Sequence, residues 1–514
     1  MIMQVPLLWL TLLLPLVVSM ASLLLRTSNA RLTAYLGGLA LVIPALIVVY
    51  YGVTFSLNEG VFDPVQIDLE SYGLGRFMLY IDGLSAPIVL GISIVTGLVS
   101  IYSIKYMNHR IDEMREKGES PPDFNVYYAL YVIFSVSMLG MAYSTNLAEF
   151  YIFLELSLLS SFALIAYYGY GDRRRIALLY FVWTHIAGAL FLAGVLYYGF
   201  KAGTFDVVKL IEGLPAYVSP FTEKGYQIVA WLIIIGLFIK MAVFGVHMWL
   251  PYAHAEAPTP VSALLSPNLI GIAGYALARF ALPLFPSLFS TYQWGFIALA
   301  FVTIIYGGLV ALRQDDFKRF LAYSSVSQMG YMLLGIFTLT AYGIGGSMLH
   351  YLSHAVGKAI LFMVAGVFIA ELGGLRAINR MGGLARRYPL IAAVSLLGFM
   401  HLVGIPPALG MWSEILIVFG LVKSVPLAGV GSVVIVSSLV IIAFGITAAY
   451  SFITMRKIFF GPLRLAGREE LLDDFKASIA VIAVLGIFFF LAITPFSEAL
   501  RIASAVLSSI AGGG

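Results

Sequence analysis

The stretch Ile228–Leu265, IVAWLIIIGLFIKMAVFGVHMWLPYAHAEAPTPVSALL, decides how the rest of the chain is read. It predicts an apolar helix with a lysine, Lys240, near its middle, followed by a proline-rich segment between Pro251 and Pro260. A cation at that depth in hydrocarbon costs about 2.5–3.5 kcal/mol on insertion scales, so the amine should face protein or water and have a partner. Interrupted backbone is tolerated at membrane depth only where it lines a cavity. This pattern is typical of an ion or proton path; the alternative is a lysine whose amine extends to the lipid headgroups.

The composition indicates a polytopic membrane protein. Of the 514 residues, 61% are hydrophobic and 11% are charged, whereas a soluble domain has about 25% charged residues. Cysteine is absent, which excludes disulfides, thiolate metal sites and iron–sulfur ligation. Apolar segments of roughly twenty residues predict about fourteen transmembrane helices in an all-α fold. They lie near 5–25, 32–54, 83–104, 126–144, 147–169, 175–200, 227–250, 260–282, 292–312, 317–338, 341–370, 388–420, 430–459 and 474–500.

Basic residues fall mostly on alternate loops. One set of loops holds Arg26, Arg31, Lys105, Arg110, Arg115, Lys117, Arg173, Arg174, Arg175, Arg313, Lys318, Arg319, Arg376, Arg380, Arg386, Arg387, Arg456, Lys457, Arg464 and Arg468. The opposite loops hold Arg76, Lys201, Lys209, Lys224 and Lys423. Because cytoplasmic loops are enriched in lysine and arginine, the first set predicts the cytoplasmic side. We therefore expect the chain in the cell (inner or cytoplasmic) membrane with both termini outside.

The spans divide into four expected regions. Residues 1–125 hold three transmembrane helices, 126–285 and 286–460 hold two blocks of five, and 461–514 hold the last helix. Each block has a proline-interrupted fourth member, at Pro251–Pro260 in the first and Gly404–Pro407 in the second. An odd number of helices gives the two blocks opposite orientations, and broken helices in corresponding positions indicate an inverted repeat.

Two ionisable residues are expected to pair in the first block. Glu155 lies within the apolar stretch FYIFLELSLLSSF. An isolated carboxylate there needs a cation, and Lys240 is the natural partner for a buried ion pair. The alternative is an inert pair that only fixes the packing of two helices. Intramembrane ionisable groups are functional by default, which favours the pair as part of an ion path.

A row of polar side chains is expected along the span at 341–370. His350, His354 and Lys358 follow each other at intervals of four residues, so they share one helical face. Imidazoles about 6 Å apart along the helix make a relay that water can bridge. Passive core histidines or a metal site are the alternatives, but no His-Glu-x-x-His pattern supplies a third ligand, so no metal is expected.

The relay is expected to continue in the second block and at the first helix break. Glu414, in GIPPALGMWSEILIVFG, occupies about the place in the second block that Lys240 occupies in the first. His247 and His254 flank the first break and could exchange protons with Lys240. Alternating acids and bases suit stepwise proton transfer, because the charge of each site changes the proton affinity of the next.

Six stretches resemble the antiporter-like membrane subunits. They are IDGLSAP, NLAEFYIFLELSLLSSF, KMAVFGVHMWLPYAHAEAPTPVSALLS, DDFKRFLAYSSVSQMGYM, LHYLSHAVGKAILF and WSEILI, and the resemblance runs from about Asp82 to Phe460. That family includes the proton-pumping subunits of respiratory complex I, their counterparts in membrane-bound hydrogenases, and the large subunits of Mrp-type sodium/proton antiporters. It implies fourteen helices, two inverted five-helix repeats, and broken seventh and twelfth helices.

The resemblance also assigns residues. Glu155 and Lys240 match the family's fifth-helix glutamate and seventh-helix lysine, and Glu414 matches its twelfth-helix charged position. Many members carry a further lysine in the eighth helix, where this chain has Gly271. The connection between the half-channels must then use water, Asn268 or the histidines.

The resulting hypothesis is a proton-translocating subunit of a multisubunit energy-converting membrane complex, such as a membrane-bound hydrogenase or a complex I-like oxidoreductase. Sodium is the alternative coupling ion. Expected partners are other membrane subunits, including homologous antiporter-like subunits, and a peripheral redox module, with no nucleic acid and no cofactor on this chain. The alternatives are a subunit of an Mrp-type antiporter, a stand-alone cation/proton exchanger, or a membrane enzyme with a histidine-bound metal.

Overall fold

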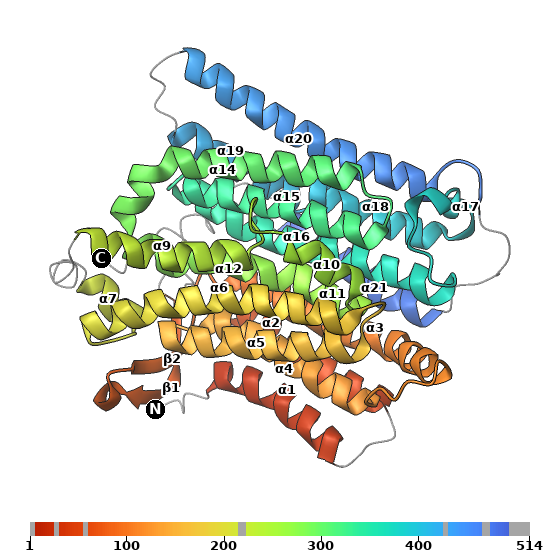
Figure 1. The fold of residues 1–514 in the computed structure, drawn as a ribbon, viewed down its shortest axis with the longest axis horizontal. Coiled ribbons are helices and arrows are strands. Elements are labelled where there is room, and N and C mark those ends of the chain that lie inside the picture. The colour runs from red at the N-terminus through yellow and green to blue at the C-terminus, as the bar shows by residue number, and fades with distance from the viewer. Residues whose placement is uncertain are drawn as a thin grey trace.

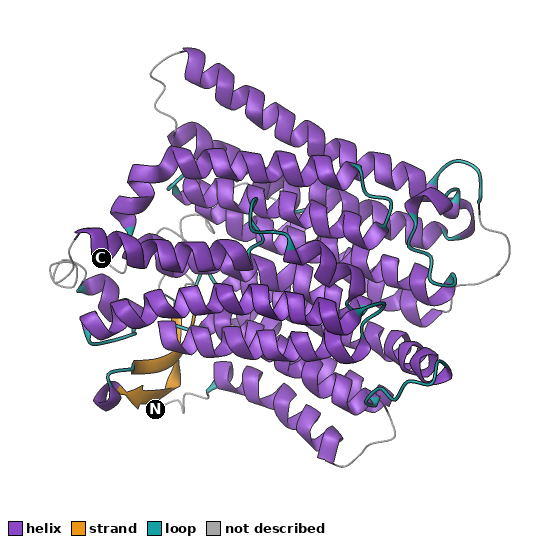
Figure 2. Cartoon of the chain, in the orientation of Figure 1, coloured by secondary structure: helices purple, strands orange, loops and turns teal. Residues whose placement is uncertain are grey.

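The protein is a bundle of long helices with a small hairpin at one end (Figures 1 and 2). The computed structural model describes residues 6–24, 30–54, 60–213, 223–424, 430–464 and 473–492. The predicted positions of both termini, Arg26 and Arg468 lie outside the described residues. Most helices run along one common direction, and α1 and α20 lie along opposite edges of the bundle (Figure 1).

The first half of the chain contains the hairpin and the helices on both sides of the first break. The elements are α1 (Leu7–Leu24), α2 (Ala30–Thr54), β1 (Val61–Leu69), η1 (Glu70–Tyr72), β2 (Gly75–Ile81), α3 (Ala86–Glu116), α4 (Phe124–Tyr143), α5 (Leu147–Tyr168), α6 (Arg173–Ala202), α7 (Val207–Glu212), α9 (Glu223–Lys240), α10 (Trp249–Glu256), α11 (Thr259–Leu264), η2 (Leu265–Leu269), α12 (Ile270–Ala276), η3 (Leu277–Ala281) and α13 (Leu282–Leu284). Both η2 and η3 are π-helical turns.

The second half is also helical. Its elements are α14 (Pro286–Leu312), α15 (Phe317–Phe337), α16 (Ala341–Glu371), η4 (Ile378–Arg380), α17 (Leu384–Arg387), α18 (Pro389–Val403), α19 (Gly410–Ser424), α20 (Val430–Phe459) and α21 (Asp473–Ala492). In the described part of the chain, 11 helices are long and apolar enough to cross a membrane, and three shorter apolar helices accompany them. The chain is therefore a multi-pass helical membrane protein.

The all-α expectation is wrong for one segment. Strands β1 and β2 pair antiparallel, with Val61 opposite Ile81 and Leu69 opposite Gly75. They lie in a stretch that hydropathy marks only as a polar loop. Asp63 from this hairpin accepts a hydrogen bond of 2.8 Å from the backbone nitrogen of Leu8, so the hairpin caps the start of α1.

Helix α16 lies at the centre of the bundle. It packs against α3, α15, α18 and α19, and all of its residues from Gly343 to Ile369 are buried. Small residues allow the neighbouring backbones to approach closely. A Cβ atom on Gly346 would lie 2.9 Å from the backbone nitrogen of Ile417, so the contact of α16 with α19 depends on glycine there. The predicted histidine row is consequently shielded from lipid.

Two helix breaks interrupt the bundle. Helix α9 ends at Lys240, and Ala242 and Gly245 follow with φ angles of 58° and 89°. The indole nitrogen of Trp249 donates 2.9 Å to the carbonyl of Ile239, which satisfies one of the open carbonyls at that helix end. Lys240 therefore lies at the end of a helix, whereas the sequence predicted the middle. The helix stops before the prolines because the left-handed backbone and the indole already end it.

The second break differs in its relation to the charged residue. Helix α18 ends at Val403, Gly404 has a φ angle of 70°, and α19 begins only at Gly410. Glu414 lies on α19, after the break, whereas Lys240 lies before its break. The expectation that these two residues occupy corresponding places is therefore wrong.

Candidate functional site: buried ionisable side chains

Lys240 is buried at the first break, with 3% of its surface exposed. Its amine has no hydrogen-bond partner among the described residues. Glu155 is close enough to act on the amine electrostatically, but no nitrogen–oxygen distance of 4.0 Å or less joins the two side chains. The carboxylate of Glu155 therefore acts on the amine of Lys240 electrostatically, without direct contact. The amine does not reach the lipid headgroups, which removes the alternative reading of Lys240.

Glu155 contacts a histidine that the sequence reasoning missed. Its Oε2 lies 3.1 Å from Nδ1 of His185 on α6, and the imidazole stacks on Phe181 with ring centroids 5.3 Å apart. A Cβ atom on Gly188 would lie 2.2 Å from Oε1 of Glu155, so a glycine lets α6 approach the carboxylate. The predicted direct ion pair between Glu155 and Lys240 is therefore wrong. A histidine inside the predicted span 175–200 was the signal that could have indicated this partner.

The Glu155–His185 pair lies at the side of the bundle. The side chain of Glu155 is 18% exposed and that of His185 is 49% exposed. Around them, Ile152, Leu156 and Ile186 also expose apolar surface. An ionisable pair is costly against lipid, so this face of α5 and α6 is suited to cover by another membrane subunit.

The two histidines near the first break are buried but unbonded. Neither ring nitrogen of His247 or His254 has a hydrogen-bond partner in the described chain. His254 lies with its ring 5.0 Å from that of Phe362, and the amines of Lys318 and Lys358 act on it electrostatically. Buried polar atoms without protein partners bind water in folded proteins. Both histidines are thus available for proton exchange through water.

The row on α16 is present, and most of its members are anchored. Nδ1 of His350 lies 3.2 Å from Oγ of Ser413. Lys358 donates to the carbonyl of Leu321 at 2.8 Å and to the hydroxyl of Ser324.

His354 differs from the other two members of this row in its hydrogen bonding. Neither of its ring nitrogens meets a partner within normal hydrogen-bond geometry in the described residues, although the carbonyl of Pro267 acts on the ring. A second missed histidine, His401 on α18, lies beside the row with Nδ1 2.9 Å from Oγ of Ser353.

Glu414 is enclosed at the second break. It is 6% exposed, and a Cβ atom on Gly404 would lie 2.2 Å from its Oε2, so the carboxylate fits against the glycine that ends α18. Its Oε1 has no hydrogen-bond partner among described residues. Its sequence neighbour Ser413 contacts His350. Glu414 itself acts electrostatically on Tyr331, whose ring centre lies 5.6 Å from that of His350.

Asn268 lies where the two halves meet. It belongs to the π-helical turn η2, and such turns are frequent at functional sites. The hydroxyl of Tyr351 donates to its backbone carbonyl at 3.2 Å, while its Nδ2 has no partner in the described part of the chain. A Cβ atom on Gly271 would lie 2.4 Å from Cδ2 of Tyr351. The aromatic ring therefore fills the space beside the position where the resemblance suggests a lysine.

The described residues contain no group of three or more His, Cys, Asp or Glu side chains placed as metal ligands would be. The arrangement instead consists of single bases and acids spread along helices α5, α6, α9, α10, α16 and α19. It defines a class of protein: a multi-pass helical membrane protein with separated ionisable side chains around two broken helices.

Comparison with known proteins gives the family. The family described as "NADH:quinone oxidoreductase/Mrp antiporter, TM" matches residues 144–441, and the complex I chain 5 N-terminal family matches residues 75–116. The chain belongs to this family of antiporter-like subunits.

Individual relatives agree with this assignment. F(420)H(2) dehydrogenase subunit M of Methanosarcina mazei is 31% identical over 448 residues, which cover 85% of each chain. NADH-quinone oxidoreductase subunit M of Rickettsia prowazekii is 30% identical over 425 residues, covering 82% of this chain and 83% of that one. A chain of respiratory complex I from Thermus thermophilus superposes with a TM-score of 0.79 and 27% identity, covering 98% of this chain and 99% of the other.

Proposed function

We propose that this chain carries protons across the membrane as one subunit of a redox-driven membrane complex. The observation that carries the proposal is the amine of Lys240, buried at a helix break with Glu155 nearby and no direct partner in the described residues. Leaving a buried amine without any direct partner is costly, so a role in packing alone does not account for Lys240. A lysine that exchanges a proton with water has a reason to remain unbonded.

The proposed path begins at the side of the bundle. A change in a neighbouring subunit alters the charge on Glu155 and His185, and with it the field that acts on Lys240. The proton that leaves Lys240 passes through water to the histidines. Asn268 and Tyr351 lie between the halves and line the connection that an eighth-helix lysine supplies in other members. The path then follows His354 and His350 to Glu414.

The finer architecture belongs to the same proposal. Counting the three shorter apolar helices with the 11 long ones leads to fourteen spans, with residues 126–285 and 286–460 as inverted repeats. The distribution of basic loops supports both termini outside. We propose no redox cofactor on this chain, whose lack of cysteine supports that view. A peripheral redox module would supply the energy, and protons are preferred over sodium because bases and acids line the path.

The named relatives are subunits of an F(420)H(2) dehydrogenase and of NADH-quinone oxidoreductases. These names support a redox-driven host. An Mrp complex from Dietzia also contains a chain of the same fold, with a TM-score of 0.79 and 24% identity. An antiporter host is therefore the second candidate.

The test replaces Lys240 by alanine in the complete complex. Membrane vesicles are energised with NADH or F(420)H(2), and acidification of their interior is followed with a pH-sensitive dye. Lys240→Ala is expected to abolish proton transport while the complex still assembles, because the path loses its first base. The control, Lys201→Ala, removes an exposed lysine from the last turn of α6 and should leave transport unchanged. Normal transport in Lys240→Ala would refute the proposal.

The host is tested by two further measurements. Replacing sodium by choline in the medium separates the coupling ions, since a proton pump keeps its rate. Identifying the chains that co-purify distinguishes a redox complex from an antiporter, and transport by the isolated chain in liposomes would favour a stand-alone exchanger.

A further inference from the structure

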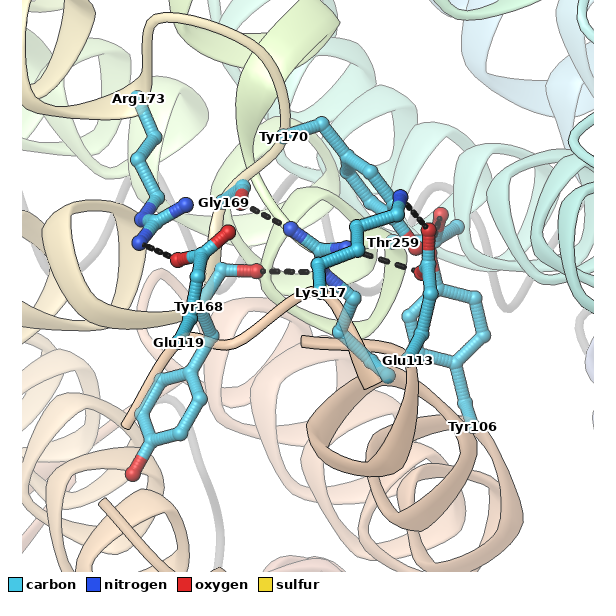
Figure 3. A network of polar contacts seen from close by, with 10 residues as sticks. Tyr106, Glu113, Lys117, Glu119, Tyr168, Gly169, Tyr170, Arg173 and Thr259 are labelled. Atoms are coloured by element: carbon cyan, nitrogen blue, oxygen red, sulfur yellow. Dashed lines mark hydrogen bonds and ion pairs between the residues drawn. The ribbon is translucent and has the colours of Figure 1, made fainter. Parts of the chain in front are cut away.

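A row of three hydroxyl groups lies where the loop after α5 meets α3 and the start of α11 (Figure 3). The hydroxyls of Tyr170 and Tyr106 are 2.7 Å apart, and that of Tyr106 lies 2.9 Å from Oγ1 of Thr259. The three residues come from the loop after α5, from α3 and from the start of α11. Each hydroxyl can donate and accept a hydrogen bond at once, so the row can pass a proton by exchange along its length.

The outer member of this row is held firmly in place. The guanidinium of Arg110 lies 4.0 Å from the ring centre of Tyr170, and its Nε donates to the carbonyl of Tyr168 at 3.2 Å. The backbone nitrogen of Tyr170 donates 2.7 Å to the carbonyl of Glu256. The loop after α5 is thereby fastened to α3 and to the end of α10. Tyr170 is partly exposed while Tyr106 and Thr259 are buried, so the row leads inward.

A buried lysine, Lys318, lies beside the row, near the ring of Tyr170. Lys318 has no exposed surface, although the sequence placed it among the basic residues of the loops predicted to face the cytoplasm. Its amine donates to the carbonyl of Ala257 and lies 5.8 Å from the ring centre of Tyr170. No carboxylate oxygen among the described residues lies within 4.0 Å of this amine. Asp316 and Glu256 act on the amine electrostatically from farther away. Burying an amine with no carboxylate in direct contact is costly, which indicates a role beyond packing.

The carbonyl that Lys318 contacts belongs to the joint between α10 and α11. Pro258 and Pro260 follow it, and proline has no N–H to offer to the preceding turn. Thr259, the inner member of the hydroxyl row, lies between these prolines. His254 precedes the joint on α10, and the amine of Lys318 acts on it electrostatically. The joint thus brings together the hydroxyl row, a buried amine and an unbonded imidazole.

We propose that Tyr170, Tyr106 and Thr259, together with Lys318, form the port through which protons reach His254 from this end of the bundle. This inference rests on the proposed function and adds its point of access. Water gives a proton to the hydroxyl of Tyr170, and each hydroxyl passes its own proton to the next oxygen. Water near the carbonyl of Ala257 then carries a proton from Thr259 to Lys318 in its neutral form, and a further water carries it from Lys318 to His254. Every hydroxyl gains one proton and loses one, so the row is restored when the hydroxyls rotate back.

The first test removes one hydroxyl and keeps the ring. Tyr106→Phe in the complete complex should lower the rate of proton transport about a hundredfold, the lower end of what a positioned proton-transfer group contributes. The matched control is Tyr102→Phe, one helical turn earlier on α3. Tyr102 is equally buried, but its hydroxyl donates to the carbonyl of Met363 at 2.8 Å, outside the row. The control should transport at the wild-type rate.

The second test separates a proton carrier from a structural cation. Lys318→Arg retains the positive charge and the hydrogen-bond donors, but a guanidinium does not release its proton in proteins. The proposal expects Lys318→Arg to transport as poorly as Lys318→Gln, with normal assembly measured by co-purification. If the arginine variant transports at the wild-type rate, Lys318 is structural and the proposal fails.

The proposed port and the proposed function can be overturned separately. Wild-type transport in Tyr106→Phe, when Lys240→Ala is inactive in the same vesicles, overturns this port and leaves the proposed function intact. Normal transport in Lys240→Ala overturns the proposed function itself. If Lys318→Arg does not assemble, the result of Tyr106→Phe decides, because that variant changes a single oxygen atom.

Discussion

The two helix breaks hold their charged residues in opposite ways. At the first break, Lys240 ends a helix, and its amine makes no hydrogen bond within the described residues. The carboxylate that acts on it electrostatically, Glu155, is partly exposed at the side of the bundle. At the second break, Glu414 follows the break and is enclosed. Around it, hydrogen bonds join Ser413 with His350 and Ser353 with His401.

This difference suggests separate tasks for the two halves. In the proposed function, the charge of Glu155 and His185 at the outer face controls the first half, where a neighbouring subunit would change it. In the second half, the histidine row is shielded, because α16 is buried along nearly all of its length. A buried, hydrogen-bonded network keeps its geometry, which suits a passage that conducts what the first half releases.

Among the further variants that test this comparison, the largest effect is expected at Glu414. Glu414→Gln keeps the shape of the side chain but removes its charge and its ability to exchange a proton. Transport should fall about a hundredfold, as for loss of a positioned acid or base, while the complex still assembles. The measurement is the transport rate of vesicles as a function of pH. An unchanged rate and pH profile would contradict the assignment of Glu414 to the path.

An intermediate effect is expected at His185, and it tests the comparison directly. His185→Gln keeps a donor for Glu155 but removes a group that can carry charge, and a hydrogen bond to a charged group is worth about 1.5–3 kcal/mol. Since His185 is half exposed, we expect the transport rate to fall about tenfold, near the lower end of that range.

The matched variant in the second half is His401→Gln. His401 contacts a serine hydroxyl, and a neutral hydrogen bond contributes about 1 kcal/mol, so a smaller loss is expected. If His401→Gln reduces transport more than His185→Gln does, the charge at the outer face of the first half does not control proton transport.

The smallest effect on transport is expected for Gly271→Ala, where the two halves of the chain meet. Its effect is expected on stability instead. In Gly271→Ala, the new methyl group meets the ring of Tyr351, and overpacking of this kind costs about 1–3 kcal/mol of stability. Thermal unfolding of the purified chain in detergent measures that cost. Gly295→Ala is the control, because a Cβ atom there meets nothing within 4 Å. Equal melting temperatures for the two variants would show that Tyr351 does not fill this space.

Much of the architecture could be read from hydropathy. Apolar length predicted the long spans, and α15 and α16 begin and end within a few residues of the segments expected at 317–338 and 341–370. The hairpin was missed because its short strands lie in a polar stretch between two spans. The place of Lys240 was misjudged because Gly245 and the indole of Trp249 end α9 before the prolines do.

The contacts between side chains were harder to anticipate. The partner of Glu155 is His185, thirty residues away, and their meeting depends on the close approach of α6 at Gly188. The burial of Lys318 was also missed, because a lysine at the start of a helix looks the same in sequence whether it faces water or the inside of the bundle.

By itself, the sequence determined that this is a helical membrane protein with bases and acids inside it. Hydrophobic length and the cost of a charge in lipid depend only on which residues follow one another. Only the tertiary structure decided which of these groups touch, which remain unbonded and which face outward. Those properties depend on how closely distant helices approach, and that distance is set by packing between segments far apart in the chain.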